Sequence, residues 1–208
     1  MPDHPRELYI AGTGSFALEV VEYAKATGRR AAGLIELIDP ARVGSEIHGL
    51  DVVALSDERR AGSEVVIGTG GDRLGYWGVL AEHGWRPAIV VHPTAQISLS
   101  AVAGDGLVVG PGAIVGAASE LGPHVLVGRG ALIGHHVRIG AGATLNPGVN
   151  IAGHVVIGER AVIGMGAVIS NRVEVGPGAV VAAGAVVIRQ VEAETRVQGV
   201  PAHVFSPR

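Results

Sequence analysis

Residues 125–163 read VLVGRGALIGHHVRIGAGATLNPGVNIAGHVVIGERAVI, and their six-residue period decides the fold of this chain. From Ile97 to Val187, sixteen positions spaced six apart are all apolar. The position four residues further on is small or β-branched almost throughout, and Gly usually follows the aliphatic residue. One short strand and one tight corner per six residues predict a solenoid with three flat faces. In such a solenoid 18 residues complete a coil, and sixteen units make about five coils.

The residues before the repeat alternate between strand and helix patterns. Apolar runs at 8–11, 31–35, 64–67 and 88–91 predict strands. The first and third runs end in glycine-rich turns, and each turn is followed by a helical pattern, over 15–27 and 72–82. We expect Ser15 to cap the first helix, with Leu18, Val21 and Ala24 on its apolar face. Such alternation predicts a small parallel sheet with helices on its faces and ligands at the carboxyl ends of its strands.

Charge also divides the chain in two. Residues 1–92 carry 9 basic and 13 acidic side chains, whereas residues 93–208 carry 7 and 6. We therefore expect an α/β domain over 1–92, with a Rossmann-like parallel sheet, and an all-β domain over 93–208.

Composition excludes several classes of function. The formal charge is −3 and basic residues form no run, so nucleic acid is not expected as a partner. The absence of Cys removes disulfides, thiolate nucleophiles and Cys-ligated zinc. No window offers the roughly 20 consecutive apolar residues of a membrane span, and the start lacks the apolar segment of a signal peptide. We expect a soluble cytoplasmic protein.

Residues 18 apart should stack about 4.8 Å apart, one coil above the other. His135 then begins a column with Gly153, Asn171 and Arg189, and His136 stacks beneath His154. Neutral imidazole accepts a proton readily near pH 7, so His135 is a candidate general base. By the same stacking, Arg138 should pair with Glu120 at the surface.

Several segments together resemble one family, the hexapeptide-repeat sugar acyltransferases of the sialic acid O-acetyltransferase (NeuD) and UDP-4-amino-sugar N-acetyltransferase (PglD) type. The segments are LYIAGTGSFALEVVEYA at the start, VVIGTGGDR and VVHPTAQIS before the repeat, LIGHHVRIG and IAGHVVIG within it, and VQGVPAHV near the end. The resemblance implies a left-handed parallel β-helix, a homotrimer with active sites between neighbouring prisms, and acetyl-CoA as co-substrate. It implies acetylation of a sugar, most of all at the amino group of a nucleotide-linked 4-amino sugar.

The resemblance also assigns roles to residues. His135 falls on the catalytic base, and Gly153 on the residue whose backbone N–H steadies the thioester oxyanion and contacts the cofactor. The remaining acetyl-CoA contacts fall on Thr144, Met165 and Ala183. The nucleotide-sugar site falls on Gly12, Gly14, Ser15, Phe16, Glu36 and Gly68, where a glycine-rich loop lets phosphates approach a helix N-terminus.

The chain departs from the family at several of these positions. The family usually has a carboxylate directly after the catalytic His, but His136 stands here, and no Asp or Glu occurs between Glu120 and Glu159. Thr144 replaces a second His, and Phe16 replaces the His of the glycine loop.

Other functions stay open at this point. O-acetylation of a sialic-acid-like sugar would use the same base and cleft. A trimeric binding module without catalysis is favoured by the missing carboxylate. A zinc hydration enzyme of the γ carbonic anhydrase type would need three histidines across a cleft, but no His-x4-His pair is present, so we expect no metal.

Overall fold

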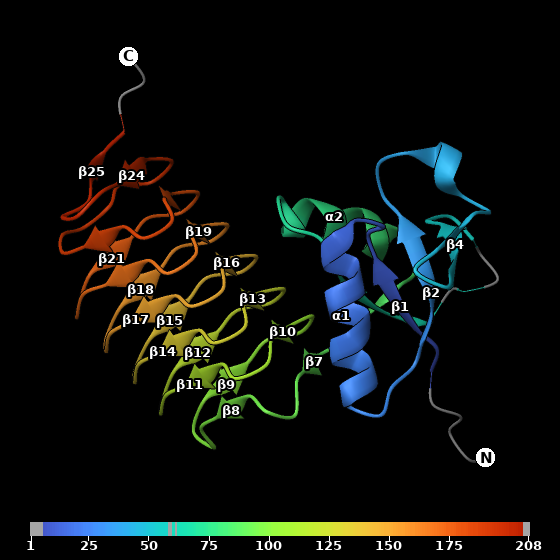
Figure 1. Ribbon diagram of the computed structural model, residues 1–208, viewed down its shortest axis with the longest axis horizontal. Coiled ribbons are helices and arrows are strands. Elements are labelled where there is room, and N and C mark those ends of the chain that lie inside the picture. Colours follow the sequence, from blue (N-terminus) through green and yellow to red (C-terminus); the bar gives the residue numbers. More distant parts are fainter. Residues whose placement is uncertain (1–5, 58–59, 61, 206–208) are drawn as a thin grey trace.

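The computed structural model describes residues 6–57, 60 and 62–205. Figure 1 shows an elongated prism of stacked short strands, with a smaller unit of sheet and helices against its N-terminal half. Neither helix in the described part has the length and apolar character that crossing a bilayer requires.

The smaller unit is built on a sheet ordered β3-β4-β2-β1-β5-β6. Its strands are β1 (Leu8–Ala11), β2 (Ala31–Glu36), β3 (Glu46–Ile47), β4 (Leu50–Ala54), β5 (Glu64–Ile67) and β6 (Arg86–Pro87). All neighbours pair in parallel except β3 with β4. The helices are α1 (Ser15–Ala26) and α2 (Arg73–Glu82), and a short 3-10 turn, η1, covers Pro40–Arg42. The chain runs from β1 to β2 on one side of the sheet and from β5 to β6 on the other, so the strand order reverses between β1 and β5, a position at which α/β sheets bind ligands.

In helix α1, the N-cap residue and the buried face both differ from those expected. Ser15 is the first helical residue, and the cap is Gly14, whose extended backbone makes no side-chain cap hydrogen bond. The buried face consists of Ala17, Val20, Tyr23 and Ala24. Leu18, expected inside, is 38% exposed, because small residues at 17 and 24 let the helix pack closely on the sheet.

The prism has the expected 18-residue coil. Sixteen two-residue strands, β8 (Gln96–Ile97) to β23 (Val186–Val187), begin every six residues. Their partners lie one coil apart, as in Val127↔Leu145, Ile133↔Ile151 and Ile139↔Ile157. The strands that place the site are β12 (Glu120–Leu121), β13 (Leu126–Val127), β14 (Leu132–Ile133), β15 (Arg138–Ile139), β16 (Thr144–Leu145), β17 (Asn150–Ile151), β18 (Val156–Ile157) and β19 (Val162–Ile163).

The repeated aliphatic residues fill the inside of the prism, and those from Val109 onward are buried. Ile97 is half-buried and Ala103 is exposed, because the first coil has no complete coil beneath it. Where Gly follows the aliphatic residue, it lets consecutive coils approach closely. At Gly134, for example, a Cβ would lie 2.8 Å from the backbone of Ala152 on the next coil.

One expected strand belongs elsewhere. Val90–Val91 forms β7, which pairs with β10 (Val108–Val109) of the prism and does not close the α/β sheet. At the far end, β24 (Arg196–Gln198) pairs with β22 (Val180–Val181), and β25 (His203–Val204) runs antiparallel to β24. The eight-stranded face of the prism therefore begins before His92.

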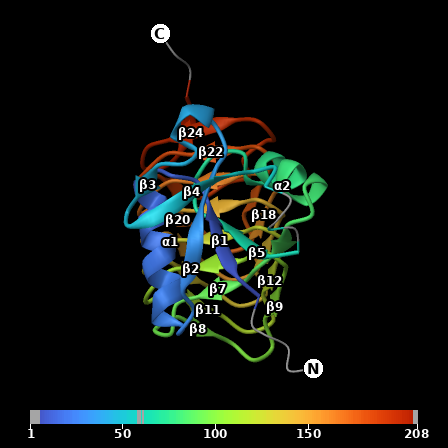
Figure 2. The same ribbon diagram turned by 90° about the vertical axis from the view of Figure 1, so that its right-hand side faces the viewer.

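Arg73, at the start of α2, attaches the α/β unit to the prism. Its side chain is fully buried, and Nε donates to the carbonyl of His124 at 2.8 Å while Nη1 donates to that of Thr69 at 2.8 Å. Burial lowers the pKa of Arg73 to about 10, so it remains charged at neutral pH. Trp77 stacks on His124, and burial together with the Arg73 charge lowers the pKa of His124 to about 4. Figure 2 shows the α/β unit in front of the prism.

Candidate active site

His135 lies exposed on the prism edge that joins the face of β14 to the face of β15. Its Nδ1 is 3.0 Å from Nδ1 of His136, so one of the two imidazoles donates a hydrogen bond to the other. The ring of His154, one coil above His136, is stacked over it with centroids 4.9 Å apart. The ring of His135 stands perpendicular to both, at 5.2 and 5.0 Å.

Gly153 lies directly against the ring of His135. A Cβ at this position would be 2.8 Å from both Nε2 and Cε1 of that ring. The backbone N–H of Gly153 has no partner within the described ranges, and its carbonyl faces the side-chain amide of Asn171 on the next coil. The structure thus brings His135, Gly153 and Asn171 into one column.

Charges around this edge come from arginines and one carboxylate. Arg138 pairs with Glu120 at 4.0 Å, as the sequence predicts. Desolvation lowers the pKa of His154, and the neighbouring imidazoles and the guanidinium of Arg172 act in the same direction. Together with Ala118 and Val156, the side chains of Glu120, His136, Arg138 and His154 line a hollow of about 350 Å³.

Two of the expected acetyl-CoA contacts lie on a different edge of the prism from His135. Met165 and Ala183 are exposed and lie one coil apart, since Gly184 N–H donates to the Met165 carbonyl at 2.8 Å. They follow strands of the eight-stranded face, whereas His135 follows a strand of the six-stranded face. A single chain therefore does not bring these residues to the candidate base.

Thr144 is buried on strand β16, and its hydroxyl has no hydrogen-bond partner within the described ranges. It lines a cavity of about 290 Å³ between α1 and the prism. Phe16 and Arg129 line the same cavity, and Arg129 also pairs with Glu19 of α1 at 2.7 Å. Phe16 thus belongs to this cavity and is not among the residues that line the hollow beside its neighbours Gly12 and Gly14.

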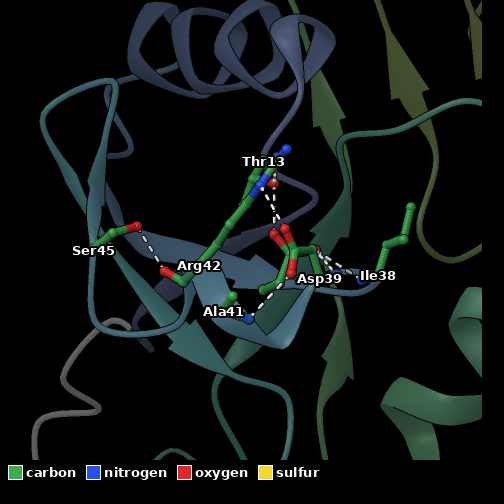
Figure 3. Close-up of polar contacts among 7 residues, drawn as sticks. Thr13, Ile38, Asp39, Ala41, Arg42 and Ser45 are labelled. Atoms are coloured by element: carbon green, nitrogen blue, oxygen red, sulfur yellow. Dashed lines mark hydrogen bonds and ion pairs between the residues drawn. The ribbon is translucent and has the colours of Figure 1, made fainter.

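A second hollow, of about 200 Å³, lies at the carboxyl ends of β1 and β2. The residues that line it are Gly12, Thr13, Gly14, Glu36, Leu37, Ile38, Asp39, Arg42 and Thr69. Figure 3 shows Arg42 extending from η1 toward Thr13 over this hollow. Its Nη1 donates to the Thr13 hydroxyl at 3.0 Å, and its Nε lies 3.5 Å from Asp39.

The carboxylate of Glu36 accepts hydrogen bonds from neighbouring groups of the protein. One carboxylate oxygen accepts from the N–H groups of Ile38 and Asp39 at 2.7 and 3.0 Å, and the other accepts from the Thr13 hydroxyl at 2.7 Å. Burial would raise the pKa of Glu36, but these hydrogen bonds outweigh burial and hold it below its usual value. The carboxylate is therefore ionised and shapes the turn that carries Arg42.

Ser15 and Gly68 are not among the residues that line the hollow. Ser15 is exposed at the start of α1, and Gly68 is buried beneath that helix. A Cβ on Gly68 would lie 2.4 Å from Ile10 and 3.2 Å from Ala17, so this glycine permits close packing of α1 on the sheet.

Sequence reasoning missed Thr13, Asp39 and Arg42. One available signal was the Asp39-Pro40 pair shortly after the end of a strand at Glu36, which is typical of a cap and first residue of a helical turn. Asp39 does cap η1, accepting from Ala41 N–H at 3.2 Å, and that turn presents Arg42.

Comparisons with known proteins agree with this arrangement. Residues 136–171 and 154–189 match the family model described as bacterial transferase hexapeptide (six repeats). PerB from Caulobacter crescentus, solved with CoA and GDP-perosamine, is 31% identical over 96% of this chain and 97% of that chain, with a TM-score of 0.88. A variant of perosamine N-acetyltransferase from the same organism, solved with the same two molecules, is 30% identical over 97% of each chain, with a TM-score of 0.89.

The acetyltransferase domain of PglB from Neisseria gonorrhoeae, in complex with acetyl coenzyme A, is 28% identical over 97% of this chain and all of that one, with a TM-score of 0.86. The comparison with curated protein sequences gave no match. Because the structural matches cover both parts of the chain, they confirm a left-handed β-helix preceded by a parallel-sheet unit.

Proposed function

Because the chain belongs to the hexapeptide-repeat sugar acyltransferases of the NeuD and PglD type, we propose that it acetylates the amino group of a nucleotide-linked 4-amino sugar. It is an acetyl-CoA-dependent acyltransferase acting on a sugar, with acetyl-CoA as co-substrate. Membership of this enzyme family favours an acyltransferase over a non-catalytic module or a zinc hydration enzyme.

The observation that carries the proposed mechanism is the seating of His135 between His136 and Gly153. With His136 Nδ1 as acceptor, His135 carries its proton on Nδ1 and leaves Nε2 free to take one from the neutral sugar amine as its nitrogen attacks. The amine nitrogen attacks the thioester carbon, and the C–S bond breaks. The proton held by His135 then passes to the leaving CoA thiolate, so no covalent enzyme intermediate is needed.

His136 takes the place of the usual carboxylate in this proposal. A neutral imidazole acceptor fixes the tautomer and orientation of His135 as a carboxylate would, but it supplies no negative charge to stabilise imidazolium. The Gly153 N–H has no partner among the described residues and supplies a donor for the thioester oxygen as negative charge develops there.

The edge that carries Met165 and Ala183 and the edge that carries His135 can form one site only between two copies of the chain. In the proposed homotrimer, the edge of one protomer that carries Met165 and Ala183 faces the edge of its neighbour that carries His135. Acetyl-CoA then lies between them, in contact with both. This arrangement accounts for the separation of the expected site residues within one chain.

In this proposal the α/β unit and the prism have separate roles. We propose that residues 1–92 hold the nucleotide sugar in the hollow beside Gly12 and Gly14, and that residues 93–208 perform acyl transfer. Arg42 provides a cation at the mouth of that hollow, which suits the diphosphate of a nucleotide sugar. Glu36 supports the hollow through the turn that follows it.

A thiol-release assay tests the proposal. Acetyl-CoA is supplied with UDP-, dTDP- and GDP-linked 4-amino sugars and with free sialic acid, beside the His135→Ala variant. We expect turnover on one amino sugar and a loss of about 10²- to 10⁴-fold in His135→Ala, the usual contribution of a general base. Turnover only on sialic acid would favour O-acetylation, and an unchanged rate in His135→Ala would refute the assigned base.

A further inference from the structure

The imidazoles of His135, His136 and His154 converge on one point of the prism edge. Each offers a ring nitrogen, and these three atoms all lie within 4.8 Å of one another. All three side chains are exposed, so they are free to rotate and open to ions from solvent. The group contains no carboxylate, and imidazole nitrogen is its only type of ligand atom.

The spacing is close to that of a zinc site. With Zn–N bonds of about 2.0–2.1 Å in a tetrahedron, neighbouring ligand nitrogens are about 3.3 Å apart. The Nδ1 atoms of His135 and His136 are 3.0 Å apart already. The His154 nitrogen would have to approach by about 1.5 Å at most, which a side-chain rotation at an exposed position supplies.

The backbone holds two of these histidines in place. His136 and His154 occupy left-handed corners with φ of 55° and 59°. His136 N–H donates to Ala117 at 2.8 Å and His154 N–H donates to His135 at 3.0 Å, so each corner is tied to the coil below. An ion would therefore order only side-chain torsions, at a small entropic cost.

Nearby charges limit the affinity without preventing binding. Arg172 opposes a cation beside His154. Arg138 is paired with Glu120 on the same face, which reduces its repulsion. Three neutral imidazoles favour zinc, cobalt, nickel or copper over magnesium and calcium, which prefer oxygen ligands.

We propose that His135, His136 and His154 bind one divalent transition-metal ion of the zinc class. With Nδ1 of His135 bound to the ion, the ring proton lies on Nε2, which then has no free lone pair to accept a proton, so the ion reversibly inhibits acetyl transfer. The inhibitory effect rests on the proposed function, in which His135 is the base, whereas the binding itself does not.

Metal binding is measured directly on the full chain without an affinity tag. Equilibrium dialysis against Zn²⁺ with elemental analysis gives stoichiometry, and titration with Co²⁺ gives the visible absorption of a tetrahedral site. The test variant is His154→Asn, because Asn tolerates a positive φ. The matched control is His48→Asn, since His48 is also exposed, has φ of 55° and lies in the β3–β4 turn of the α/β unit.

We expect one Zn²⁺ per chain. Affinity should be weaker by more than about tenfold in His154→Asn, because loss even of an outer partner of a metal ligand costs about 10- to 100-fold. The His48→Asn control should bind as the parent does. Absence of binding to the parent, or equal binding by both variants, would overturn the metal site.

Acetyl transfer measured with and without Zn²⁺, followed by a chelator, separates the two proposals. Inhibition that the chelator reverses supports the inference as a whole. Binding without inhibition would overturn the inhibitory effect and the assignment of His135 as base. If the parent chain binds no metal but His135→Ala loses acetyl transfer, the proposed function stands and the metal proposal is refuted.

Discussion

The substitution Gly153→Ala tests how the candidate base is seated. The added Cβ would lie 2.8 Å from Nε2 and Cε1 of His135. Carbon contacts are optimal at about 3.5–4.0 Å, so the imidazole has to move by about 1 Å. The backbone of Gly153 has no positive φ, and the obstructing atoms belong to an exposed side chain, so the prism itself should fold normally.

A displacement of about 1 Å at a reacting group costs about 10²-fold in rate, which corresponds to about 2.7 kcal/mol in the activation free energy. We therefore expect kcat/KM for acetyl transfer to fall about 100-fold in Gly153→Ala. The backbone N–H of residue 153 is still present, so the loss reports the position of His135. Steady-state kinetics with acetyl-CoA and the accepted sugar measure it, and a thermal melt checks the fold.

Gly78→Ala is the matched control. Gly78 lies in α2, and a Cβ there meets nothing within 4 Å. This variant should keep its full rate. A Gly153→Ala enzyme that melts as the parent does and also keeps its full rate would refute both the contact and the role given to His135.

Three further predictions follow from other parts of the molecule. Arg73→Ala should lower the free energy of unfolding by more than about 3 kcal/mol in urea titrations. The reason is that each buried carbonyl left without a donor costs about 1–3 kcal/mol. An unchanged urea midpoint would contradict this. The lowered pKa of Glu36 means that its stabilisation is complete above the usual value of 4.5 and is lost as pH falls through the folded value. Glu36→Gln should therefore be less stable than the parent at pH 7, and its midpoint should fall less between pH 7 and pH 3; equal pH dependence would argue against this. If two protomers share each site, refolding a mixture of inactive His135→Ala and Met165→Asp chains should recover activity that neither has alone, and no recovery would refute a site shared between protomers.

Much of the architecture could be predicted from the sequence because its signals are local and repeated. The six-residue period predicts the 18-residue register seen in Val127↔Leu145, and the strand-turn-helix pattern predicts β1 and α1. Periodicity could not show which face of α1 is buried, because Leu18 and Ala17 are both apolar and only packing against the sheet distinguishes them. Periodicity also could not assign Val90–Val91 to the prism, because a single apolar run does not indicate which strand it pairs with.

The sequence by itself determined the coil, its apolar interior and the stacking of His135 on Gly153, because each follows from a count of residues along one chain. Only the tertiary structure decided which side chains meet. It joined His135 to His136 and engaged the Glu36 carboxylate with the turn that follows it. The physical reason is that such contacts depend on side-chain rotation and on how faces and units pack together. These are long-range properties that a local pattern does not encode.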